Sequence, residues 1–348
     1  MWKEYRTLKV WNERIMNAKS WIKRVLIALL IAAAVLGGVW GFQMLGQTGM
    51  PREDEQRPII LGFSQLGSES GWRIGNTRSV VKAAADAGIQ LMERNAEQKQ
   101  ENQIKALRSF IAYQVDVIAF SPKVEDGWDN VLREAKEAGI PVICSDRAVK
   151  VEDDSLIACF VGSDFYDQGV RAGKFLLRKM EGVPGPIRIA EISGTVDSTP
   201  MRVRARGFRD MIANDPRFEI VYSKSGDFLR SMGKEVMRDI LSTAEVDVLY
   251  SHNDAMTLGA VEAIEAGGMI PGRDIVIITV DGEQGAIDLL KQGKINCVVE
   301  CTPMLGDIIM VLAKKLVAGE EIPRVIYSEE TMFTEFDDNL LSIPPRGY

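Results

Sequence analysis

From residue 58 onward, short apolar runs alternate with amphipathic stretches, and this pattern restricts the possible folds more than any other feature. The runs carry apolar residues at successive positions, as in a parallel sheet whose two faces are both covered by helices. The stretches between them, such as 97–114 and 127–139, carry apolar residues at helical spacing. We therefore predict an α/β fold whose parallel strands lie at 58–65, 89–95, 115–122, 140–147, 156–164, 186–194, 218–225, 246–254, 275–282 and 295–301.

These strands fall into two successive sets of five, which predicts two lobes of similar build. VDVIAFSP (115–122) and VDVLYSHND (246–254) each stand third in their set and hint at an internal duplication. A chain of 348 residues is also long enough to form two hydrophobic cores.

The first 57 residues have a different composition. Residues 1–24 hold seven basic and two acidic side chains, and the following run, 25–45, contains one strongly polar residue, Gln43. As a helix these 21 residues would extend about 31 Å, enough to cross the hydrocarbon core of a membrane. By the positive-inside rule, we predict a cytoplasmic basic leader (1–24), a transmembrane signal-anchor (25–45) and an external linker (46–57).

Whether this segment is retained or cleaved stays open from the sequence. Cleaved signal peptides have a shorter apolar core that ends in small residues. Here Ala32–Ala34 lie inside the apolar run, and the bulky Trp40 and Phe42 follow them. We favour an uncleaved anchor, with secretion of the body as the alternative.

Composition excludes several classes of function. The net charge of −7 gives no basic face for a nucleic acid, and a single histidine, His252, leaves little for a histidine metal site or a Ser-His-Asp triad. No GxSxG, Walker, HExxH, GxGxxG or CxxC motif is present. We therefore expect no enzymatic activity, no cofactor and no metal. Of the four cysteines, Cys144 and Cys159 could pair, but buried free thiols are favoured.

Nearly every predicted strand ends in a polar residue. In open α/β sheets, ligands bind beyond the carboxyl ends of the strands. Helix capping is the competing explanation, and we assign about half of these positions to capping alone, Ser121 and Asp164 among them. Capping does not explain Arg147, Glu300 or Trp72. The full set of strand-end residues is Gln65, Asn95, Ser121, Asp146, Asp164, Thr195, Asp227, Asn253, Asp281 and Glu300.

Two loops combine features that sugar binding requires. A sugar offers hydroxyl groups, which suit carboxylate, amide and guanidinium partners, and an apolar C–H face, which packs on an aromatic ring. Glu69 and Trp72 share the loop GSESGWR, and Phe228 lies in SGDFLR. The alternative for Trp72 is a hydrophobic anchor for the first helix, and the alternative for Phe228 is packing in the core. Asp281 and Glu300 could instead form a glycosidase pair, although two carboxylates alone are a weak signal.

Long blocks of the chain resemble the periplasmic sugar-binding proteins of ABC importers, of the ribose- and galactose-binding type, and most closely the galactofuranose-binding members. The resemblance extends from about residue 58 to the terminal Gly347–Tyr348. It is carried by GFSQLGSESGWR (62–73), QKQENQIKALRSFIAYQVDVI (98–118), Gly194–Val196, SGDFLRSMGKEVM (225–237), HNDAM (252–256), LGAVEAI (258–264) and VDG (280–282).

This resemblance implies a type I periplasmic binding fold. Two Rossmann-like lobes with parallel sheets, 58–163 with 301–330 and 164–300 with 331–348, would be joined by a three-strand hinge and close on a monosaccharide. The body would be a monomer on the periplasmic or extracellular face of the cell membrane. Its partners would be a sugar, for which galactofuranose is the best candidate, and the permease and ATPase subunits of an ABC transporter. A membrane-anchored sensor that signals to a kinase or chemoreceptor is the alternative, although 1–24 contains no recognisable signalling module.

The resemblance also implies the ligand-binding residues. Arg204 is preferred to Arg202 as the arginine on the first helix after the sixth strand, and Arg73 and Thr195 come from the galactofuranose-type blocks. His252 is expected to point away from the site. The predicted ligand contacts are Glu69, Trp72, Arg73, Asp146, Arg147, Thr195, Arg204, Phe228, Asn253, Asp281 and Glu300.

Overall fold

The computed structural model describes Trp21 and residues 57–348, and residues 58–348 form one compact unit. The predicted transmembrane segment 25–45 lies outside the described residues. Among the residues that are described, no helix is both long enough and apolar enough to cross a membrane.

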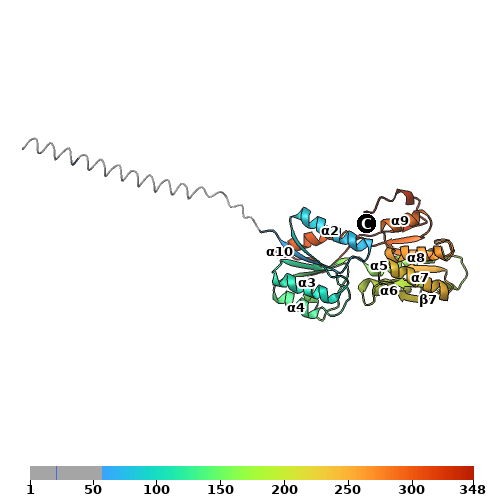
Figure 1. Cartoon of the computed structure of the whole chain (residues 1–348), viewed down its shortest axis with the longest axis horizontal. Helices are drawn as coiled ribbons and strands as arrows, with labels where there is room; N and C mark the ends of the chain where they lie inside the picture. Colours follow the sequence, from blue (N-terminus) through green and yellow to red (C-terminus); the bar gives the residue numbers. More distant parts are fainter. Residues whose placement is uncertain (1–20, 22–56) are drawn as a thin grey trace, which may run out of the picture. The chain divides into compact units, whose positions relative to one another are not determined.

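The first lobe is built on a six-stranded parallel sheet. Helices α2 (Gly71–Ala87) and α10 (Gly306–Val317) pack on one face, and α3 (Gln100–Ala112) and α4 (Asp129–Glu137) pack on the other (Figure 1). Because helices cover both faces, side chains at successive strand positions are buried, which explains the uninterrupted apolar runs. In spatial order the strands are β11 (Val325–Tyr327), β5 (Cys159–Gly162), β4 (Val142–Ser145), β3 (Val117–Phe120), β1 (Ile60–Gln65) and β2 (Gln90–Asn95).

The second lobe repeats this architecture. Helices α5 (Phe165–Lys179) and α6 (Thr199–Ile212) cover one face of its sheet (Figure 1). The other face is covered by α7 (Arg230–Thr243), α8 (Asp254–Ala266) and α9 (Gln284–Lys291). All strand pairs are parallel except β12 with β10. The strand order is β12 (Met332–Thr334), β10 (Cys297–Glu300), β9 (Val276–Asp281), β8 (Val248–Ser251), β6 (Ile187–Ser193) and β7 (Phe218–Ser225).

The chain passes between the two sheets three times. It crosses after β5, again between β10 and α10, and finally between β11 and β12. All ten predicted strands are confirmed. The two edge strands β11 and β12 were not predicted, because each has three residues and is too short to show a period.

Of two residues that were predicted to cap helices, the structure confirms one and contradicts the other. Asp164 is the N-cap of α5, where its Oδ1 accepts hydrogen bonds from the amides of Tyr166 and Asp167, as predicted. Ser121 is not a cap, and that prediction is wrong. Its hydroxyl accepts a hydrogen bond from Arg73 at 3.0 Å and bonds Asp146 at 3.1 Å, so it belongs to a buried ionic cluster described below.

Candidate ligand-binding site

A small cavity of about 30 Å³ lies between the two lobes, at the carboxyl ends of strands from both sheets. Nine of the eleven predicted ligand contacts line it, and Thr195 and Glu300 do not. The lining residues are Glu69, Trp72, Arg73, Asp146, Arg147, Pro200, Arg204, Phe228, Asn253, Asp281 and Cys301.

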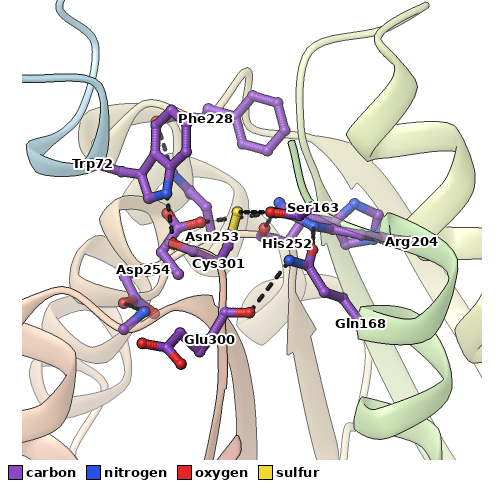
Figure 2. Close-up of polar contacts among 12 residues, drawn as sticks. Trp72, Ser163, Gln168, Arg204, Phe228, His252, Asn253, Asp254, Glu300 and Cys301 are labelled. Carbon is purple, nitrogen blue, oxygen red and sulfur yellow. Dashed lines mark hydrogen bonds and ion pairs between the residues drawn. The ribbon is translucent and has the colours of Figure 1, made fainter. Parts of the chain in front are cut away.

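Trp72 is the second residue of α2, and both of its nitrogen atoms are bonded. Ser70 caps this helix by accepting from the amide of Arg73. The Trp72 amide donates to Glu283 Oε1 of the other lobe at 2.7 Å, and its indole Nε1 donates to the Cys301 carbonyl at 2.6 Å (Figure 2). Trp72 is 4% exposed, and its ring is therefore fixed in orientation on the cavity wall.

Phe228 brings a second ring to the cavity from the loop between β7 and α7. Its φ of 60° and that of Asp227, 54°, lie in the left-handed region, which side chains other than glycine rarely adopt. A Cβ atom at Gly194 would lie 1.9 Å from the ring, so only glycine leaves room for it there. Such strained conformations persist where surrounding structure holds them, and they concentrate at binding sites.

Arg73 is the centre of a buried ion cluster in the first lobe. Its Nε lies 3.1 Å from Glu69 Oε1, and its Nη2 lies 2.7 Å from Asp146 Oδ2. Burial by itself lowers the pKa of Arg73, but the charges of Asp146 and Glu69 outweigh it, and the pKa is raised. Arg73 is therefore a compensated charge whose donors are largely occupied.

Arg147 has a buried hydrogen-bond donor that no group in the described part of the protein satisfies. Its Nη1 donates to the Lys123 carbonyl at 3.1 Å, whereas its buried Nε has no hydrogen-bond partner. The nearest carboxylate oxygens, of Asp146 and Glu69, lie 3.8 Å and 3.9 Å from the guanidinium group. Burial, and next the charge of Arg73, lower the pKa of Arg147 to about 10, so it is still protonated at neutral pH. A buried donor without a partner is costly, and a ligand with oxygen atoms would satisfy it.

Arg204 is the corresponding arginine of the second lobe. It is 3% exposed, and it donates to Gln168 Oε1 at 2.8 Å and to the His252 carbonyl at 2.7 Å (Figure 2). Arg202, the alternative on the same helix, lies at the surface and pairs with Glu125 at 2.9 Å. The structure thus places Arg204, rather than Arg202, in the cavity.

Asp281 and Asn253 complete the polar wall of the second lobe. Asp281 has a φ of 133°, and its Oδ1 lies 3.9 Å from Arg204. Burial, and then the nearby carboxylate of Asp254, raise the pKa of Asp281 well above its usual range. Asn253 caps α8 by accepting from the amide of Met256, so it serves the helix and the cavity together.

Two predicted contacts lie outside the cavity. The Thr195 carbonyl accepts from Ser198 in the turn before α6. The Glu300 carboxylate bonds the amide of Thr331 and pairs with Arg346, so it joins the last crossings and the C-terminal segment. Cys301, the next residue, lines the cavity instead. Strand alternation could have pointed to it, because neighbouring residues face opposite sides.

His252 and all four cysteines are buried. The His252 ring is buried and lies 3.1 Å from Glu191, away from the cavity as predicted. All four cysteines are free and buried. Burial raises the pKa of Cys301 well above its usual range, which keeps the thiol protonated. Within residues 57–348 and at Trp21, no group of three His, Cys, Asp or Glu side chains is placed to hold a metal ion.

The two lobes also touch directly around the cavity. Besides the bond from Trp72 to Glu283, the Thr199 hydroxyl donates to the Ala148 carbonyl at 3.1 Å. The salt bridge between Arg202 and Glu125 joins the lobes at another point. The structure is therefore that of the closed lobes.

Comparison with known proteins agrees with this geometry. The family model of the periplasmic binding protein domain matches residues 61–321. The galactofuranose-binding protein YtfQ of Escherichia coli (strain K12) is 39% identical over 281 residues, which cover 79% of this chain and 88% of that protein.

Two solved structures are similar over most of their length. One, from Mycobacterium smegmatis in complex with β-D-fucofuranose, shares 46% identity with a TM-score of 0.79, covering 80% of this chain and 91% of that one. The other is the periplasmic binding protein of the arabinose ABC transporter from Shewanella sp. ANA-3, bound to α- and β-L-arabinofuranose. It shares 42% identity with a TM-score of 0.78, covering 81% and 93%. The chain therefore belongs to the periplasmic binding protein family, among the sugar-binding proteins of ABC transporters.

Proposed function

We propose that this protein captures a monosaccharide in its furanose ring form, closes its two lobes on it, and delivers it to an ABC import permease. The observation that carries the proposal is the pairing in one cavity of a fixed indole ring, Trp72, with the unsatisfied donor of Arg147. The furanose form is supported by the names of the three relatives above, which specify galactofuranose, fucofuranose and arabinofuranose.

The charges of the cavity suit a neutral, polyhydroxylated ligand. Each guanidinium group has a carboxyl oxygen within 3.9 Å, and the two arginines of the first lobe are matched by the two acidic side chains of Asp146 and Glu69. Hydroxyl groups can donate to the carboxyl group of Asp281 and accept from Arg147 and Arg204. The C–H face of the sugar would then pack on the ring of Trp72 or Phe228.

Capture outside the cytoplasm requires export of the body. We propose that 25–45 stays as a membrane anchor and that the two lobes comprise 58–163 with 301–330 and 164–300 with 331–348. Membership in a periplasmic family and the basic residues that precede the apolar run support this arrangement. N-terminal sequencing of protein extracted from membranes tests the anchor, and a chain that begins after residue 45 would contradict it.

The ligand proposal is tested with the full-length protein, purified and stripped of bound sugar. We would titrate it by calorimetry with L-arabinose, D-galactose, D-fucose, D-ribose and D-glucose, and would record the anomeric carbon resonance of each ¹³C-labelled sugar that binds. We expect binding of one or more of the first three sugars, with a bound resonance typical of a furanose. The apparent affinity is lowered by the small furanose fraction in solution. No heat with any sugar would contradict the proposed function, and a pyranose resonance would contradict the ring form.

A further inference from the structure

One carboxylate, that of Glu330, receives hydrogen bonds from all three crossings between the lobes. The Ser163 hydroxyl, in the first crossing, lies 2.5 Å from its Oε1, and the amide of Thr302, in the second, lies 2.9 Å away. Ser328 and Glu330 both lie in the third crossing, and the Ser328 hydroxyl lies 2.9 Å from the same carboxylate oxygen. This carboxylate therefore fixes how the three segments lie against one another.

Gln168 connects this carboxylate to the cavity. It lies on α5, 2% exposed, and its Nε2 donates to Glu330 Oε2 at 2.7 Å and to the Glu300 carbonyl at 3.2 Å. Its Oε1 accepts from Arg204 Nε at 2.8 Å (Figure 2). Arg204 can only donate and the Glu300 carbonyl can only accept, so the amide has a single orientation that satisfies both.

The first lobe is also connected to the Glu330 carboxylate, through Trp72. The indole of Trp72 donates to the carbonyl of Cys301, and the next residue, Thr302, donates its amide to Glu330. The Cys301 thiol also lies 3.2 Å from the Ser163 hydroxyl. Arg204 from the second lobe and Trp72 from the first are thus each two hydrogen bonds away from the carboxylate that ties the crossings together.

We infer that Gln168 is a positioning residue, which holds Arg204 for the ligand and links its placement, through Glu330, to the three crossings about which the lobes close. This inference rests on the proposed sugar-binding function. It assigns to Gln168 an effect on affinity and on the hinge although it does not line the cavity.

A charge swap tests this link. Gln168→Glu keeps an acceptor for Arg204 but sets two carboxylates against each other. In Glu330→Gln the single amide oxygen can accept from Gln168 or from the donors of the three crossings, but not from both. In the double variant Q168E/E330Q, the new Glu accepts from both Arg204 and the new Gln, whose Oε1 again accepts from Ser163, Ser328 and Thr302. The donor to the Glu300 carbonyl is lost, and a carboxylate oxygen faces that carbonyl instead.

Two quantities are measured on the full-length protein, the sugar affinity by calorimetry and the hydrogen exchange of peptides that contain 300–304 and 328–332. We expect Gln168→Glu to weaken affinity at least tenfold and to speed exchange in both peptides, and the double variant to recover most of both losses. Gln292→Glu, an exposed position on the same lobe, adds the same charge and should change neither quantity.

An unchanged Gln168→Glu protein, or a double variant no better than the sum of the single ones, would overturn the inference. Melting curves separate these results from a failure to fold. Should the wild-type protein bind no sugar, the proposed function fails, and the exchange data alone then decide the role of Gln168. Recovery of slow exchange in the double variant would uphold the link, and its absence would refute it.

Discussion

At the scale of the residue, Trp72 carries several interactions at once. Its ring faces the cavity, its indole nitrogen bonds a crossing segment, and its amide bonds the opposite lobe. Arg73 also lies over the ring, 4.6 Å from the centroid, which restricts its motion further. Substitutions at this residue can separate ring stacking from the hydrogen bond to the hinge.

We expect Trp72→Ala to weaken sugar binding at least tenfold while the protein remains folded, because the stacking surface is lost. Trp72→Phe keeps a ring and loses only the bond to Cys301, so its affinity should be intermediate. Calorimetry measures both. As a control, Trp128→Phe removes a comparable indole bond, to the Val124 carbonyl, in the core of the first lobe away from the cavity. Trp128→Phe should lower the stability of the protein and leave its sugar affinity unchanged. If Trp72→Ala binds the sugar as tightly as the wild type does, the stacking role is disproved.

At the scale of the element, helix α2 gains its N-terminal carboxylate from the other lobe. Its first turn contains no acidic residue of its own, and Glu283 supplies one by accepting from the Trp72 amide at 2.7 Å. A negative charge at a helix N-terminus stabilises it by about 0.3–1 kcal/mol, and up to ~2 kcal/mol when partly buried. Because this contact joins the two lobes, it stabilises only the state in which the lobes are closed.

Glu283→Gln should therefore speed release of the sugar, by roughly threefold to tenfold, with little change in the association rate. Stopped-flow tryptophan fluorescence gives both rates. Glu262→Gln is a suitable control, because Glu262 pairs with Arg230 and Lys234 on the surface of the second lobe. A slower association with unchanged release would contradict this assignment.

At the scale of the whole molecule, each lobe has its own core, and an ionic cluster is buried within the second. Glu191 bonds the His252 ring at 3.1 Å, the Ser223 hydroxyl at 2.5 Å and Arg209 at 2.5 Å. Burial by itself raises the pKa of Glu191, but the hydrogen bonds of His252 and Ser223 and the charge of Arg209 lower it to about 2. Burial lowers the pKa of His252 as well.

Both shifts predict that stability falls with falling pH. Below about 6.5 the unfolded state binds more protons at His252, and between about 4.5 and 2 it binds more at Glu191, so acid favours unfolding. The Glu191 shift alone corresponds to roughly 3 kcal/mol, present above its unfolded pKa and lost as pH falls to about 2. Urea unfolding at pH 7, 5, 4 and 3 measures this slope, which Glu191→Gln should reduce. Identical slopes for the two proteins would refute the assignment.

The sequence by itself determined the strands and the loops that carry the site. Each apolar run is local, its burial follows from helices on both faces of the sheet, and all ten predicted strands are present. Aromatic and polar residues at strand ends meet at one edge of a parallel sheet, and the family resemblance added Arg73 and Arg204, so nine of the eleven predicted residues line the cavity.

The tertiary structure decided which side of an element faces the cavity and what each side chain pairs with. Arg202 and Arg204 are two residues apart on a helix and so point about 200° apart. The resemblance favoured Arg204, and the packing of α6 within the second lobe places Arg204 at the cavity and Arg202 at the surface. Glu283 lies 211 residues from its partner Trp72, and Ser121 lies 48 residues from Arg73. No local pattern encodes such pairs, because they arise only when two lobes and three crossings bring distant segments within hydrogen-bond distance.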